Sequence, residues 1–90
     1  ENFFHVIGMY PPGTLVELTD KRVGMVVRES ALDIRRPQVE ILYDSNSEKV
    51  AQNYIVNLME KDPATQEFRW SVSRSIIPSP RFEIPEKYKA

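Results

Sequence analysis

The stretch YPPGTLVELTDKRVGMVVR, residues 10–28, decides the expected fold. Pro11 and Pro12 lack a backbone N–H and restrict the residue before them, so they end any helix that precedes them. Gly13 then permits a sharp change of direction. The β-rich runs TLVEL and VGMVVR follow, separated by the polar, turn-like TDKR. We therefore predict a β-hairpin over residues 14–28, with a bulge or tight bend at Gly24.

The flanking sequence extends this pattern in both directions. Residues 1–10, ENFFHVIGMY, space their apolar side chains near 3.6 residues and predict a short helix, or the end of one. Alternation over residues 38–43, and again over 68–73, predicts further strands. Residues 48–60 fit either a helix or a loop followed by a strand at 54–58, and we favour the strand.

Short strands with turns about every ten residues predict a mainly β fold, a small, strongly bent antiparallel sheet or open barrel of the Src-homology-3-like type. The expected organisation is the end of a connecting helix (1–10), a small β-barrel domain (11–76) and an extended, proline-containing C-terminal tail (77–90). The expected structural core consists of Val16, Leu18, Met25, Val27, Val39, Ile41, Phe68 and Trp70. A domain of 90 residues has a thin margin of stability.

Composition excludes several classes of site. The chain has no cysteine and one histidine, His5, which rules out the usual zinc sets. A catalytic nucleophile needs a base, normally histidine, and His5 has no obvious serine or aspartate partner in the sequence. We expect no catalytic residue, no metal site and no cofactor in this fragment. The net charge of −1 makes nucleic acid an unlikely partner. No apolar run is long enough to span a bilayer, and we expect a cytoplasmic domain without membrane contact.

Binding surfaces need a closer reading. Arg35 and Arg36, with Tyr43 as a stacking ring, could form a ligand-contact rim. The simpler interpretation is that aromatic residues fill a small core, and that the arginines are solvated charges that discourage pairing between sheet edges.

A family resemblance sharpens this interpretation. The string IGMYPPGTLVELTDKRVGMVVRES, followed by RRPQVEILYD, is similar to the segment that follows the catalytic domain in bacterial HD-GYP phosphodiesterases. That family shows a G-x-Y-P-x-G-T/S-x-V-x-L segment, then a G-x-V-V strand and an R-P-x-V-x-x-x-x-D strand. The matching residues here are Gly8, Tyr10, Pro11, Gly13, Thr14, Val16, Leu18, Gly24, Val26, Val27, Arg36, Pro37, Val39 and Asp44.

The resemblance implies a place in a larger enzyme. The family hydrolyses cyclic di-GMP at a metal centre of histidines and aspartates in an upstream helical domain, and those motifs are absent from this chain. It therefore implies a non-catalytic accessory or regulatory domain in signal transduction, whose partner is the upstream catalytic domain of the same polypeptide. Phe3, Phe4, Ile7 and Tyr10 would dock on that domain, or be covered by formation of a homodimer.

Two alternatives stay open. The first is a free-standing barrel of the KOW or Tudor type that binds RNA or peptide, because the turn and the strand containing Gly24 resemble the KOW motif. The second is direct binding of a cyclic dinucleotide by Arg35 and Arg36 together with a stacking aromatic ring.

Overall fold

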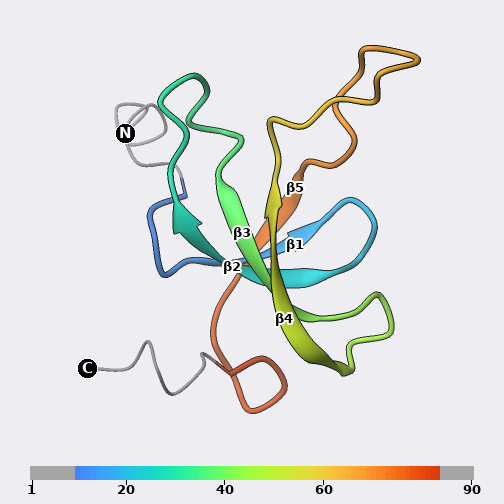
Figure 1. The fold of residues 1–90 in the computed structure, drawn as a ribbon. Coiled ribbons are helices and arrows are strands. Elements are labelled where there is room, and N and C mark those ends of the chain that lie inside the picture. The colour runs from blue at the N-terminus through green and yellow to red at the C-terminus, as the bar shows by residue number, and fades with distance from the viewer. Residues whose placement is uncertain (1–9, 84–90) are drawn as a thin grey trace.

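The computed structural model describes residues 10–83, and this part of the chain forms one antiparallel β-sheet without helices. The strands lie in the order β4-β3-β2-β1-β5 (Figure 1). Their bounds are β1 (Leu15–Leu18), β2 (Val23–Arg28), β3 (Gln38–Tyr43), β4 (Lys49–Asn57) and β5 (Val72–Ile76). The prediction of a mainly β fold is confirmed. The helix predicted over residues 1–10 lies outside the described residues except for Tyr10.

The proline-glycine segment forms a tight turn immediately before β1. The Thr14 N–H donates to the Pro11 carbonyl over 3.1 Å, and Gly13 has a φ of +97°. A proline at the second position and a positive φ at the third are typical of a type II turn. The Gly13 N–H then donates to the Val26 carbonyl over 2.8 Å, so the turn delivers the chain directly into pairing with β2.

Two hairpin loops in the sheet share one construction. In the β1–β2 loop the Leu18 N–H donates to the Arg22 carbonyl and the Lys21 N–H donates back to the Leu18 carbonyl. In the β3–β4 loop the same two bonds join Asp44 with Glu48 and Ser47 with Asp44. Lys21 and Ser47 have positive φ values of 80° and 67°. This is the three-residue hairpin in which the last loop residue is left-handed.

Gly24 allows β2 and β3 to approach closely. A Cβ atom built on Gly24 would lie 2.5 Å from the Glu40 carbonyl oxygen and 2.5 Å from Cγ1 of Val39. The register of β2 against β3 shifts between Val23 and Gly24. The predicted bulge is confirmed, and the close approach of β3 to Gly24 leaves no room for a side chain at this position.

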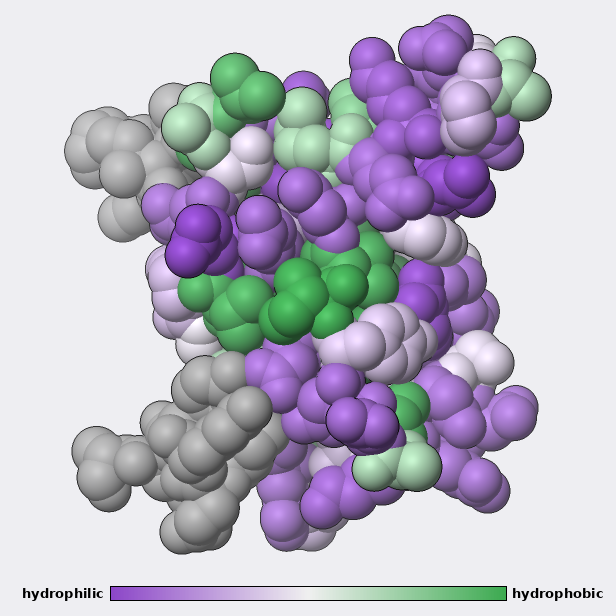
Figure 2. Space-filling model, viewed as in Figure 1, coloured by the Kyte–Doolittle hydropathy of each residue, from purple (hydrophilic) through white to green (hydrophobic). Residues whose placement is uncertain are grey.

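Apolar side chains are buried on both faces of the sheet. The first cluster comprises Val16, Leu18, Val26, Val39, Ile41, Val56 and Leu58, with Tyr10, Val50, Trp70 and Val72 packed against it. The second cluster comprises Leu15, Val23, Met25, Leu42, Tyr43 and Phe82, with Val27 and Ile76 packed against it. Neighbouring residues of one strand, such as Leu15 and Val16, belong to different clusters because side chains alternate along a strand. Apolar residues reach the surface at the middle of the face shown in Figure 2, between polar residues.

The described part of the tail covers the second cluster. Phe82 is buried, and its ring meets that of Tyr43 edge-on at a centroid distance of 5.0 Å. The Glu83 N–H donates to the Tyr43 hydroxyl over 3.1 Å, and the Arg81 guanidinium donates to the Ser47 hydroxyl over 3.2 Å. The tail therefore contributes a core residue to the domain.

The two edge strands meet at their ends without forming a ladder among the described residues. Residues 58–71, between β4 and β5, form an irregular segment that we call the arm. Within the arm Lys61 pairs with Phe68, and the Arg69 N–H donates to the Glu60 carbonyl over 3.2 Å. The sheet bends so that the end of β4 and the start of β5 lie close together (Figure 1). The sheet is thus open rather than a closed barrel.

Two sequence-based expectations need correction. The strand that we favour over a helix for residues 48–60 is confirmed, but it covers Lys49–Asn57 and not 54–58. The strand expected over 68–73 begins instead at Val72 and continues to Ile76. Phe68 lies in the arm with 37% of its surface exposed, whereas Trp70 packs against the first cluster.

Candidate functional site

Arg36 joins the ends of the two edge strands. It lies at the end of the loop between β2 and β3, directly before Pro37. Its Nη1 donates to the carbonyls of Leu58 (3.1 Å) and Trp70 (2.9 Å), and its Nη2 donates to the Ser71 hydroxyl (2.9 Å). One side chain thus bonds to the chain after β4 and to the chain before β5, where no backbone ladder is present.

Phe68 supports the Arg36 guanidinium from one side. The guanidinium carbon lies 3.5 Å from the centroid of the Phe68 ring, within the range of a cation–π contact. This contact explains why a large aromatic side chain remains partly exposed at the surface. Lys61 approaches the same ring at 5.0 Å, so two cations share it.

Arg35 is held by Asp33. Its Nε and Nη2 donate to the two carboxylate oxygens of Asp33 over 3.0 and 3.1 Å, and 70% of its side chain is exposed. Hydrogen bonds from the Arg35 side chain and backbone lower the pKa of Asp33 below its ordinary value. The same pairing raises the pKa of Arg35.

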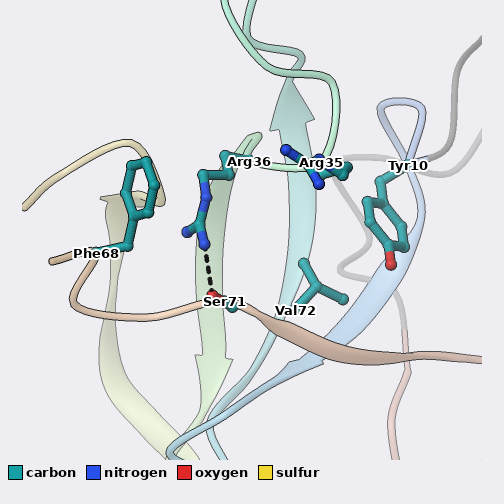
Figure 3. Close-up of a pocket in the computed structure, with 6 residues that line it drawn as sticks. All are labelled: Tyr10, Arg35, Arg36, Phe68, Ser71 and Val72. Atoms are coloured by element: carbon teal, nitrogen blue, oxygen red, sulfur yellow. Dashed lines mark hydrogen bonds between the residues drawn. The ribbon is translucent and has the colours of Figure 1, made fainter. Parts of the chain in front are cut away.

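These arginines line a surface pocket of about 290 Å³ (Figure 3). Its lining consists of Tyr10, Arg35, Arg36, Phe68, Ser71 and Val72. In Figure 3, Phe68 and Tyr10 stand at opposite ends of the pocket, with the arginines and Val72 between them. The pocket combines two guanidinium groups and two hydroxyl groups with aromatic and aliphatic walls.

A second arginine–aromatic contact lies beside the arm. The Arg22 guanidinium lies 5.0 Å from the Trp70 ring and 5.9 Å from the Tyr54 ring, and it donates to the Tyr54 hydroxyl over 3.0 Å. Burial acts to lower the pKa of Arg22, but its hydrogen bonds to Tyr54 and Asp20 outweigh that effect and raise it. Arg22 therefore stays charged while it packs between two rings.

The structure separates the residues that the sequence analysis grouped. Arg35 and Arg36 come together at the pocket, whereas Tyr43 is buried in the second cluster against Phe82. Tyr10, expected as a docking residue, lines the pocket, and Phe3, Phe4 and Ile7 lie outside the described residues. Of the eight expected core residues, five are buried (Val16, Leu18, Met25, Val39 and Ile41), Val27 and Trp70 are partly buried, and Phe68 is exposed.

Phe68, Ser71 and Val72 line the pocket, and Arg22 contacts aromatic rings, although the sequence-based expectations include none of these roles. The run FRW at 68–70, with basic and aromatic residues in succession, is a signal of such contacts. Nothing local in the sequence indicates that Arg36 meets Trp70 and Ser71, which lie 34 and 35 residues away.

Within residues 10–83, no three histidine, aspartate or glutamate side chains are grouped so as to bind a metal ion. The described residues also contain no helix with the length and apolar character needed to cross a membrane.

Comparison with known protein families identifies the family to which this sheet belongs. The family described as a KOW domain associated with an HD domain matches residues 15–64, more than half of the chain. The chain belongs to this family. No curated protein and no solved structure matches it significantly. The matched segment of this KOW domain runs from β1 through β4 and includes Gly24, Arg35 and Arg36, while β5 and the tail lie beyond it. The coarser part of the resemblance is thereby confirmed: this is an accessory domain of the kind that accompanies an HD domain.

Proposed function

We propose that the chain is the non-catalytic accessory domain of an HD-GYP-type phosphodiesterase that hydrolyses cyclic di-GMP in the bacterial cytoplasm. The observation that carries this proposal is the family match over residues 15–64. The order of the motif from Gly8 to Asp44 supports the HD-GYP type. The bent, open sheet is compatible with the Src-homology-3-like architecture that we propose for it.

The position of Tyr10 supports a role in docking. Tyr10 packs against the first cluster and lines the pocket with Arg36 and Val72. Tyr10 therefore lies beside the arginine that joins β4 to β5. We propose that Phe3, Phe4 and Ile7 contact the catalytic domain, and that Tyr10 couples this contact to the arm.

The test begins with the full reading frame that encodes this chain. We expect an HD domain with a GYP motif upstream, and we expect the purified full-length protein to hydrolyse cyclic di-GMP in the presence of manganese. The 90-residue chain alone should show no turnover under the same conditions. A reading frame without an HD domain, or turnover by the isolated chain, would overturn the proposal.

Docking can be tested separately from turnover. In the full-length protein, replacing Phe3 and Phe4 by serine should loosen the contact and change the rate of hydrolysis, whereas Leu32→Ser, at a side chain that is 85% exposed, should not. If the isolated chain covers the same residues by forming a homodimer, sedimentation velocity should show a dimer that the Phe3 and Phe4 substitutions dissociate. A monomer at all concentrations would exclude the homodimer.

A second candidate function is binding of an unpaired RNA strand or a peptide. The observation that favours it is the Tyr54 ring, which is exposed beside Arg22 and next to the partly buried Trp70, because an aromatic ring beside an arginine can stack on a base. Binding to single-stranded RNA should fall with added salt, and should fall further in Tyr54→Ala and in the double substitution Arg35→Ala, Arg36→Ala. The absence of RNA binding at low salt would reject this candidate.

A further inference from the structure

We propose that the pocket between Tyr10 and Phe68 binds an organic phosphate, a phosphate ester whose organic group is planar or apolar. This ligand site would lie in the accessory domain itself. The inference rests on the charge, the unused donors and the walls of the pocket.

The pocket carries an excess of positive charge. Two guanidinium groups line it, and the only ion pair to either of them within residues 10–83 joins Arg35 to Asp33. Arg36 instead gives its bonds to two neutral carbonyls and a hydroxyl. Its charge is thus fixed in place by neutral partners, and an anion in the pocket would neutralise it.

Both guanidinium groups keep hydrogen-bond donors unused. An arginine has five N–H donors. Arg36 uses three of these donors and Arg35 uses two in bonds to side-chain or carbonyl oxygens of the described chain. Because both guanidinium groups line the pocket, their remaining donors are available to the several oxygens of a phosphate, and charge-assisted bonds of this kind are short and strong.

The walls of the pocket favour an organic group attached to that phosphate. The Tyr10 and Phe68 rings stand at the two ends, and Val72 adds an aliphatic surface (Figure 3). A volume of about 290 Å³ exceeds what a bare phosphate needs and falls at the low end of small-molecule sites. A planar group beside the phosphate can stack on Tyr10 or on the guanidinium plane of Arg36.

The pocket is also held open by the fold. Arg36 cannot move into the pocket without breaking its bonds to Leu58, Trp70 and Ser71. Phe68 packs on the same guanidinium. The cationic wall is therefore present before a ligand arrives, which lowers the cost of ordering it on binding.

The experiment is a titration of the ¹⁵N-labelled 90-residue chain, followed by amide and arginine side-chain NMR signals. The probes are phenyl phosphate, inorganic phosphate and benzoate. We expect saturable shifts at Tyr10, Ser71 and Val72 with phenyl phosphate. We expect about fivefold to tenfold weaker binding of inorganic phosphate, which lacks the ring. Benzoate, which has the ring but fewer oxygens and less charge, should also bind more weakly than phenyl phosphate.

Two variants and one matched control test whether the ligand binds in this pocket. Arg35→Gln should keep the fold, because its side chain is mostly exposed and bonds only to Asp33, and should weaken phenyl phosphate about tenfold. Tyr10→Leu should weaken the binding of phenyl phosphate but leave the affinity for inorganic phosphate unchanged. Arg74→Gln, an exposed arginine that is paired with Glu17 and absent from the pocket lining, should change neither.

Three outcomes would overturn the proposal. The first is an affinity for phenyl phosphate that Arg35→Gln leaves unaltered. The second is a set of shifts centred on Arg22 and Trp70 instead of the pocket. The third is an affinity for benzoate equal to that for phenyl phosphate, which would show that the pocket binds carboxylates, such as an acidic side chain of a partner. None of these outcomes depends on the reaction of the full-length protein, so this inference and the proposed function can fail separately.

Discussion

Lys21 occupies a backbone conformation that suits glycine better than lysine. Its φ of 80° is at the last position of the β1–β2 loop, where the Cβ atom of an L-residue is crowded. Lys21→Gly should therefore raise the free energy of unfolding, by about 0.5–1 kcal/mol after the extra entropy of glycine in the unfolded chain is included. Urea denaturation of the two proteins measures the difference.

The same substitution at an ordinary position supplies the control. Lys49 is exposed at the start of β4 and has no positive φ, so Lys49→Gly should lower stability. Ser47→Gly, at the equivalent position of the β3–β4 loop, should act in the same direction as Lys21→Gly. A loss of stability in both loop variants would contradict the left-handed hairpin geometry.

Asp33 should titrate below the ordinary range of an aspartate, because its hydrogen bonds from Arg35 lower its pKa. A lowered pKa in the folded state adds stability above the unfolded value, and this contribution is lost as the pH falls through the folded value. Arg35→Gln should raise the pKa of Asp33 towards its ordinary value, which is measurable by ¹³C NMR of the carboxyl group. The associated loss of stability in Arg35→Gln should be present above about pH 4 and should vanish in stronger acid, where Asp33 is protonated in both proteins. An unchanged titration of Asp33 would show that the pair does not form in solution.

At the scale of the elements, the Arg36 side chain supplies hydrogen bonds between the ends of β4 and β5, where no backbone ladder joins the two strands. Arg36→Gln should remove its charge-assisted bonds to Leu58 and Trp70 and lower the free energy of unfolding by about 2–3 kcal/mol. Amide hydrogen exchange should become faster mainly in the arm, residues 58–71, because the bonds from Arg36 hold the two ends of this segment. Arg35→Gln is the adjacent control and should change stability by less than about 0.5 kcal/mol. Equal effects of the two substitutions would argue against this role of Arg36.

The tail should behave as part of the domain because Phe82 completes the second cluster. Phe82→Ala should lower the free energy of unfolding by about 3 kcal/mol, the lower end for a buried phenylalanine, since the surrounding turn can partly close the gap. Ile77→Ala, at a side chain that is 86% exposed, should have little effect. Thermal denaturation of both variants makes the comparison, and equal midpoints would show that the tail detaches in solution.

Local chemistry explains which elements could be predicted from the sequence. The turn at Pro11–Gly13 and the first hairpin depend on neighbouring residues, so their signals are visible in residues 10–28. Residues 48–60 were ambiguous because β4 is an edge strand whose exposed positions show little alternation. Phe68 alternates like a core residue, yet it faces Arg36, a partner distant in sequence. The pocket likewise depends on contacts between residues 10, 36 and 72, which no local pattern encodes.

At the scale of the whole molecule, one sheet carries two apolar clusters on opposite faces, and the expected core residues divide between them, with Val16 and Ile41 in the first and Met25 in the second. Leu15 and Val16, Met25 and Val26, and Ile41 and Leu42 divide between the clusters as neighbours on the same strand. Loss of one cluster therefore removes the support of the strands that form the other. The small size of the domain strengthens this coupling, because neither cluster alone buries much surface.

This coupling predicts a single cooperative unfolding transition. One spectroscopic probe in each cluster can test the prediction. Trp70, the only tryptophan, packs against the first cluster, and Phe82 lies in the second. Tryptophan fluorescence and the ¹⁹F NMR signal of fluorophenylalanine at position 82 should give the same urea midpoint and the same dependence on urea. Phe82→Ala, which alters only the second cluster, should move the fluorescence midpoint of Trp70 to lower urea as well. If the Phe82 signal changed well before Trp70 responded, the two faces would unfold independently, and the tail would be a separate layer on a sheet stable without it.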